Sequence, residues 1–189
     1  MIGRKRRKMA DREYDRARLK SLIHYVIWVA GARPYFGAIK LYKVLWFSDA
    51  KSFILNGKSI TGAPYIREKF GPIPRDGMQI RCELVNDGLI SQWQNHRAGD
   101  LGWHFKAIVG PNVSWMAPNE RQLVQYWINH ISEDHTAESI SDASHDYGWT
   151  IARMGERLPF FSILAERVRD PSEEEMLWAK QRAKELGLP

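Results

Sequence analysis

The strongest constraint on the fold lies in residues 39–74, where a long helical pattern is followed by a dense series of backbone breaks. Aromatic and aliphatic residues at helical spacing predict a helix over 38–55, which Asn56-Gly57 ends because glycine readily adopts the left-handed conformation of a helix C-terminus. Gly71-Pro72-Ile73-Pro74 predicts a rigid corner, since proline restricts its own backbone and that of the preceding residue. The region supplies no obvious nucleophile, metal cage or phosphate-binding loop, and it favours a scaffold that binds another protein.

Hydrophobic spacing along the rest of the chain predicts a mostly helical protein. The first helix is expected to begin near Asp11 or Tyr14 and to end by Gly31. Further helices are expected at 75–87, 118–131, 137–145 and 172–186. A short strand is expected within 65–70, and the segments 89–93 and 103–109 flank a polar, glycine-containing turn that predicts a hairpin. The predicted fold class is α+β, a mostly helical single domain with a small antiparallel hairpin or sheet.

The composition fits one domain with a substantial core. The chain has 189 residues, 44% of them hydrophobic, including 8 Trp and 7 Phe, and aromatic side chains bury a large area each. The single cysteine, Cys82, excludes an internal disulfide and lies inside a predicted helix, where we expect a small core residue rather than a reactive thiolate. The longest apolar stretch, 22–32, is too short to span a bilayer. We therefore expect a soluble cytoplasmic protein without a membrane partner.

The basic charge is concentrated at the N-terminus. Nine basic and three acidic residues lie within residues 1–20, which accounts for the whole net charge of +6 and leaves the other 169 residues neutral. The run Arg4, Lys5, Arg6, Arg7 and Lys8 would attract nucleic-acid phosphates without sequence preference. The rest of the chain lacks the clustered basic residues of a large DNA-binding surface.

Candidate catalytic groups do not form a recognisable constellation. The six histidines are scattered, and the sequence contains no His-Glu-x-x-His zinc motif, Walker loop or Gly-x-Gly-x-x-Gly motif. Ser144-His145-Asp146 places the residue types of a triad next to one another, but adjacent residues of a helix point in different directions. We expect no enzyme activity, no metal and no cofactor.

A second class of function remains open from the sequence. The order of a helix over 75–87 followed by a hairpin is that of a winged helix, in which Arg75, Arg81 and His96 would be available to a DNA duplex. The alternative hypothesis is therefore a winged-helix-like DNA-binding regulator, with the basic tail as an additional contact to nucleic acid.

Four segments of the chain form a set of motifs. They are the helix Lys40–Asp49, the turn 57–62 with Tyr65, the corner 69–74, and Ser144-His145-Asp146 with Trp149. In order and spacing the set resembles the Panacea domain, also called the SocA-like antitoxin domain, a family that includes phage-associated proteins. The resemblance covers about residues 19–150, although the spacing from His145 to Trp149 is one residue shorter than in the family pattern.

The resemblance implies an antitoxin-like module of a toxin–antitoxin system. Family members typically neutralise a toxin encoded beside them by binding it directly, and some act as adaptors that hand the toxin to a protease. The implied partners are a cognate protein toxin and, for an adaptor, a protease or chaperone. The implied organisation is a basic flexible tail at 1–12, a Panacea domain at 13–150 and a helical extension at 151–189.

Most motif residues are expected to build the fold. Leu41, Leu45 and Trp46 should pack in the core, and Asp49 should cap a turn or pair with Lys40 or Lys43. The polar or exposed motif residues are the candidates for partner binding: Lys43, Asp49, Thr61, Lys69, His145 and Trp149.

Overall fold

The computed structural model describes residues 11–94 and 102–165, together with Leu177 and Gln181. The long helices of this part are α1 (Arg16–Ala30), α2 (Ala38–Asn56), α3 (Gly77–Asn86) and α4 (Pro118–Asp134), and the short ones are α5 (Ala137–Asp142), α6 (Tyr147–Ile151) and α7 (Ser162–Ala165). The basic run 4–8, His96 and the helix expected at 172–186 lie outside the described residues. No helix within the described ranges is both long and apolar enough to span a membrane.

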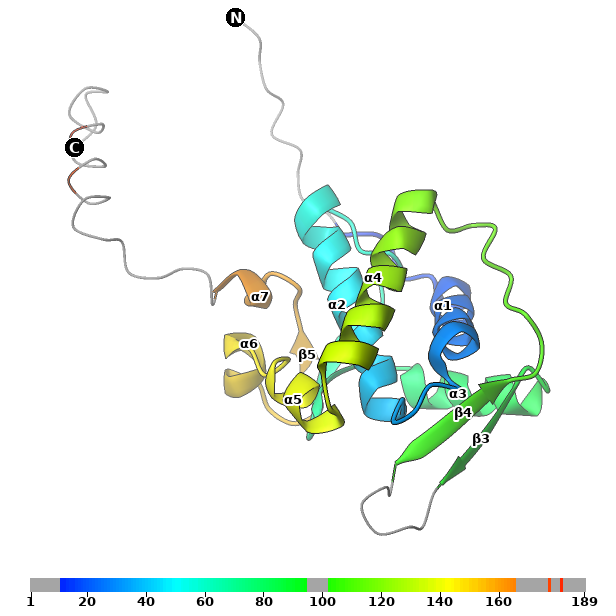
Figure 1. Ribbon diagram of the computed structural model, residues 1–189. Coiled ribbons are helices and arrows are strands. Elements are labelled where there is room, and N and C mark those ends of the chain that lie inside the picture. Colours follow the sequence, from blue (N-terminus) through cyan, green and yellow to red (C-terminus); the bar gives the residue numbers. More distant parts are fainter. Residues whose placement is uncertain (1–10, 95–101, 166–176, 178–180, 182–189) are drawn as a thin grey trace, which may run out of the picture.

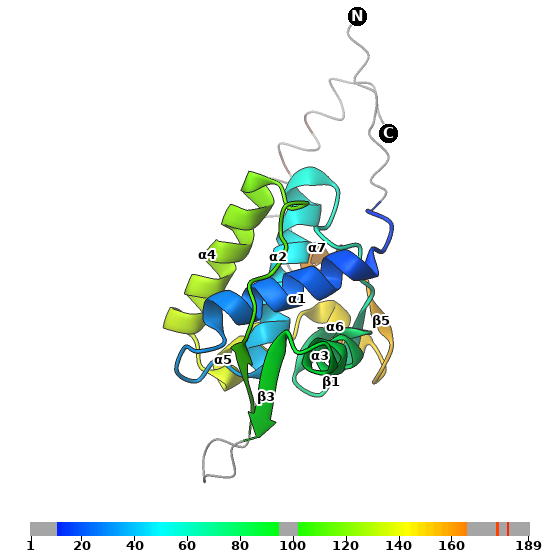
Figure 2. The ribbon, with the colours of Figure 1, turned by 90° about the vertical axis from the view of Figure 1, so that its right-hand side faces the viewer.

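Two small antiparallel sheets accompany the helices. In the first, β1 (Tyr65–Glu68) pairs with β2 (Gly71–Pro74) on one side and β5 (Arg157–Leu158) on the other, with Tyr65 opposite Pro74 and Leu158. The second is the hairpin of β3 (Ile90–Gln94) and β4 (Trp103–Ala107), which extends away from the helices in Figures 1 and 2. The predicted α+β class and the predicted hairpin are confirmed. The expected strand over 65–70 is instead a strand and the turn that leads into β2.

Helix α2 is the centre of the core. It contacts α1, α4, α5 and β2, and 12 of its 19 residues are buried. Phe47 stacks on Trp127 of α4 with ring centroids 4.8 Å apart, while Trp46 packs against Tyr65 of β1 and Phe160 on another side of the helix. The sequence predicted an amphipathic helix, but α2 is covered on more than one face, so nearly every position packs against protein.

Local signals explain where several elements begin. Helix α1 starts at Arg16 because Asp15 acts as its N-cap and accepts a hydrogen bond from Arg18 N at 3.0 Å.

Helix α3 contains Cys82 as predicted, but the expectation that this cysteine fills the core is wrong. Its thiol is exposed because the buried side of α3 runs through Ile80, Arg81 and Leu84.

Gly71 sets the corner between the first sheet and the helices. Its φ of +95° lies in the region that side-chain-bearing residues rarely adopt. A β-carbon at this position would also overlap the hydroxyl of Ser144 and the amine of Lys43. The corner is thus fixed by conformation and by close packing, which brings β2 against α2 and the chain before α6.

We expect Gly71→Ala to destabilise the protein by about 2–4 kcal/mol, because the new methyl group adds overpacking to an unfavourable φ. Gly88→Ala is the matched control, since Gly88 has φ +69° and no atom within 4 Å of the added carbon. That control should lose only about 1 kcal/mol. Urea unfolding of both variants measures the difference, and equal losses would contradict the close packing at the corner.

Candidate functional site

The first motif contact is a buried carboxylate that holds the turn after α2. Asp49 accepts hydrogen bonds from the backbone N–H groups of Ile60 and Thr61 at 2.8 and 2.9 Å, from the Thr61 hydroxyl at 2.5 Å and from the Tyr65 hydroxyl at 2.9 Å. The expectation that Asp49 caps a turn is confirmed. Pairing with Lys40 or Lys43, the other expectation, is absent from the ion pairs of the described residues.

The environment of Asp49 combines two opposing effects on its charge. Burial raises the pKa of Asp49 to about 6, while the hydrogen bonds from Thr61, Tyr65 and Ile60 act in the opposite direction. The side chain is fully buried together with Thr61. This cluster therefore positions β1 on α2 and does not present a reactive group to solvent.

We expect Asp49→Ala to destabilise the protein by about 3–5 kcal/mol, because four buried donors lose their acceptor. Asp49→Asn should lower the free energy of unfolding by less than Asp49→Ala does. The oxygen of the new amide still accepts from the two backbone N–H groups, and the NH₂ group of that amide can donate to the two hydroxyls. Tyr65→Phe, which removes one donor and leaves the carboxylate in place, should lose about 1 kcal/mol. Urea unfolding tests the order, and an Ala variant no weaker than the Phe control would contradict it.

The second motif contact, here called the corner cluster, consists of Lys43, Gly71, Ser144, His145 and Trp149. Lys43 donates from Nζ to Pro72 O at 3.3 Å beneath Gly71, and Ser144 donates to Ser141 O at 2.6 Å. The rings of His145 and Trp149 stack with centroids 3.6 Å apart and an interplanar angle of 11°. Three motif segments far apart in sequence thus meet at one corner of the fold.

Trp149 ties the corner cluster to the first sheet. Its indole N–H donates to Glu68 O at 3.0 Å, and the Arg67 guanidinium lies 4.3 Å from its ring centroid. Asp146 begins α6 by accepting from Trp149 N at 2.7 Å, and it also accepts from the Ser162 hydroxyl at 3.1 Å. Asp146 and Ser144 therefore bond to groups other than His145. The helix expected over 137–145 ends at Asp142, so these three residues lie between α5 and α6 and not on one helix as the sequence argument assumed.

Two titratable groups of the corner cluster are perturbed. Burial without a neighbouring carboxylate lowers the pKa of Lys43 to about 7. Burial also lowers the pKa of His145, and the nearby Lys43 charge lowers it further. At pH 7 the Lys43 amine is thus only partly protonated, and the neutral form of the His145 imidazole is favoured.

We expect Lys43→Met to stabilise the protein by about 1–4 kcal/mol well below pH 7, where the buried ammonium is fully charged. The pKa of Lys43 is about 7 in the folded protein and 10.5 ordinarily. Between these two pH values the unfolded chain therefore keeps the proton on Lys43, whereas the folded protein has released it. Wild-type stability therefore rises with pH in this window and the advantage of the variant disappears. Urea unfolding of both proteins at a series of pH values measures this convergence.

Lys69→Met is the control for that experiment, because Lys69 is exposed. The difference in the free energy of unfolding between Lys69→Met and the wild type should stay constant between pH 7 and 10.5, whereas the difference for Lys43→Met should shrink. An advantage of Lys43→Met that stays constant across the same range would show that the buried charge is not its cause.

The six candidate residues for partner binding divide by depth. Lys43, Asp49 and Thr61 are buried at 1% exposure or less, so the folded protein does not present them to a partner. Lys69 is exposed, and His145 and Trp149 are half-buried. These last three share one region of the surface with Phe70, which is 52% exposed. Sequence reasoning missed Phe70 and Arg67 as surface candidates, although the tight Gly71 turn was a signal that Phe70 would lie at a hairpin tip.

Exposed apolar side chains lie on several segments next to the corner cluster: the β1–β2 turn, α6 and the chain after α6. We call these segments the α6 face and define it by the exposed residues Phe70, Tyr147, Ile151, Met154 and Phe161 and the half-buried Trp149. Backbone hydrogen bonds from Arg67 N to Glu156 O and from Gly155 N to Arg67 O hold the loop after α6 against β1. Exposed aromatic and aliphatic groups of this kind are typical of protein-binding surfaces.

The winged-helix hypothesis is contradicted at one of its three residues. Arg81 is only 5% exposed, and its guanidinium lies between 5.2 and 5.7 Å from the ring centroids of Tyr42, Trp103 and Phe105. It packs where α3 meets the hairpin and is not available to a duplex. Arg75 is exposed, and His96 lies outside the described residues.

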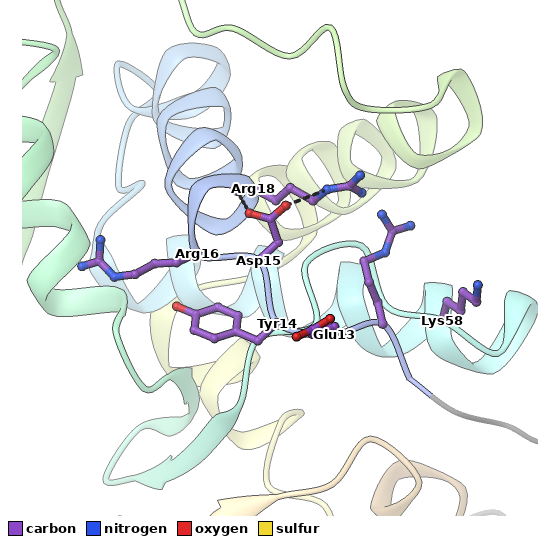
Figure 3. Close-up of a pocket in the computed structure, with 7 residues that line it drawn as sticks. Glu13, Tyr14, Asp15, Arg16, Arg18 and Lys58 are labelled. Carbon is purple, nitrogen blue, oxygen red and sulfur yellow. Dashed lines mark hydrogen bonds and ion pairs between the residues drawn. The ribbon is translucent and has the colours of Figure 1, made fainter.

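A polar hollow of about 570 Å³ at the start of α1 is lined by several cations, three of which pair with acids (Figure 3). Arg12 pairs with Glu120 at 2.9 Å, Arg16 with Glu83 at 2.6 Å, and Arg18 with Asp15 at 3.2 Å. Figure 3 shows Arg16 pointing away from Lys58, so the side chains do not converge on one point. In the part of the chain that the structure describes, no three His, Cys, Asp or Glu residues are grouped to hold a metal ion.

Comparison with known proteins identifies the family. A family model, antitoxin SocA-like, Panacea domain, matches residues 41–150 of the 189-residue chain. The match covers more than half of the chain, which belongs to this family, and the resemblance drawn from the motifs is confirmed. No curated protein and no solved structure matches the chain. Membership supports an antitoxin-type role.

Proposed function

We propose that this protein is an antitoxin that neutralises a protein toxin encoded beside it by binding the toxin directly. The observation that carries this proposal is the family match over residues 41–150. The mechanism is steric: a folded surface covers the active surface of the toxin, and no bond is made or broken.

The α6 face is the proposed toxin-binding surface. It includes Phe70, Tyr147 and Ile151, which are 52%, 58% and 64% exposed. Beside them, Trp149 and His145 form a stacked pair held by Glu68 O and Arg67. Trp, Tyr and Arg are enriched among the residues that dominate protein interfaces, which supports this assignment.

The chemistry around the corner cluster supports a non-catalytic role. The Ser144 hydroxyl is directed to a backbone carbonyl, the Asp146 carboxylate caps α6, and the Lys43 amine is buried under Gly71. The Ser141 hydroxyl does lie 3.4 Å from His145 Nε2, but Ser141 is only 4% exposed, and a serine nucleophile needs access to a substrate as well as a base. We therefore propose stoichiometric binding rather than turnover.

The test is co-expression with the products of the two flanking genes. One product should be toxic alone, should be rescued by this chain and should form a complex with it on gel filtration. Phe70→Glu and Ile151→Glu should abolish the rescue and weaken binding by about tenfold to a hundredfold. Met78→Glu on α3 is the matched control, because Met78 is 54% exposed and Phe70 is 52% exposed, and it should rescue fully.

Two results would contradict the proposal. One is the absence of any toxic flanking product that the chain rescues. The other is neutralisation of the purified toxin by far less than an equimolar amount of this chain, which would indicate catalysis. Rescue that disappears in a host lacking its cytoplasmic proteases would assign the protein as an adaptor, whereas retained rescue assigns direct occlusion.

A further inference from the structure

A second concave site lies away from the α6 face, at the start of α2. It is a cavity of about 630 Å³, a volume typical of small-molecule sites. Its walls come from the chain between α1 and α2, the first turn of α2, the start of β4, the end of α4 and the start of α5. Figure 1 shows α5 next to the beginning of α2.

Lys40 is the unusual group in this cavity. It is only 3% exposed, and its sole hydrogen bond within the described residues goes from Nζ to Ser132 O at 3.5 Å, the outer limit for such a bond. Lys40 and Ser132 both line the cavity, so the amine lies at its wall. Buried cations are normally paired with an acid, and none of the ion pairs between described residues includes Lys40.

The backbone adds a second electropositive group to the same wall. Helix α2 has 19 residues, and its N-cap, Gly37, offers no side chain to cap the first amides. Gly37, Ala38, Ile39 and Lys40 all line the cavity. The N–H groups of a first helical turn lack intrahelical acceptors and carry the positive end of the helix dipole. An anion in this cavity would meet the buried ammonium and the helix N-terminus together.

From this juxtaposition we propose that the cavity binds a small organic anion, a carboxylate or phosphate group on a partly apolar body. The anionic group takes the place of the missing counter-ion of Lys40 and accepts from the first turn of α2. The apolar body lies against Pro34, Ile39 and Ala137, and the lining also includes polar side chains, His104, His135 and Thr136 among them.

The same walls limit which anions fit. Glu138 also lines the cavity and is exposed, so a strongly charged polyanion would be repelled at that side. A bare inorganic ion would leave the apolar walls uncovered. A monoanion or dianion with an aromatic or aliphatic body would satisfy both the cationic end of the cavity and its apolar walls. Binding of such an anion is independent of the toxin-binding proposal.

The experiment is a titration of the full chain with phenyl phosphate, benzoate and inorganic phosphate, followed by calorimetry and by thermal unfolding. Phenyl phosphate or benzoate should raise the midpoint of unfolding at millimolar concentration, and inorganic phosphate should do so less. The comparison of the two organic probes distinguishes phosphate from carboxylate recognition. No response of the wild-type protein to either organic probe at about 10 mM would overturn the proposal.

Lys40→Met keeps the length of the side chain and removes its charge, and it should weaken probe binding about tenfold or more. Lys51→Met is the control, because Lys51 is on the same helix but does not line the cavity, and it should bind like wild type. Ala38→Glu places a carboxylate in the first turn of α2, where it is favourable, and should give a folded protein without a response. Unchanged binding by Lys40→Met and Ala38→Glu would overturn the assignment.

Discussion

The buried Asp49 carboxylate is the contact on which the rest of the site depends. It collects four donors from the turn after α2 and from β1, and the segment before α1 holds the same turn from the other side. Asp11 accepts from Ser59, and Asp15 N donates to Thr61 O at 3.0 Å. Because the turn is fixed to α2 and to the N-terminal segment together, β1 leaves it in one direction only. With β1 in this direction, the β1–β2 turn and Arg67 lie next to Trp149.

Much of the fold follows from local signals in the sequence. Gly57 takes the left-handed conformation that the end of α2 requires, and the alternating segments around the polar turn form the β3–β4 hairpin. Capping of a turn was one of two expectations for the motif residue Asp49, the other being a pair with Lys40 or Lys43, because the glycine-bounded loop follows within a few residues of the same helix. These features depend on neighbours along the chain, and they are therefore visible without a structure.

The candidate site was less visible because it depends on tertiary contacts. Helical spacing gives no reason to bury Lys40 and Lys43, and both are enclosed only because α4, α5 and β2 cover α2 from several sides. The exposure of Cys82 likewise follows from which side of α3 faces α1. The stack of His145 on Trp149 requires a carbonyl of β1, Glu68 O, which lies about eighty residues earlier in the chain. Pattern reasoning selected the right segments but could not rank their residues by depth.

The α6 face rests on short elements that are fastened to the core by main-chain bonds and by a few buried contacts. Helix α6 has five residues, and the loop after it is held against β1 through the backbone of Arg67, Gly155 and Glu156. Main-chain bonds do not depend on which side chains point outwards. Residues such as Tyr147, Ile151 and Met154 can therefore be exchanged during evolution with little effect on folding, so related chains can differ on this surface while they keep the same scaffold.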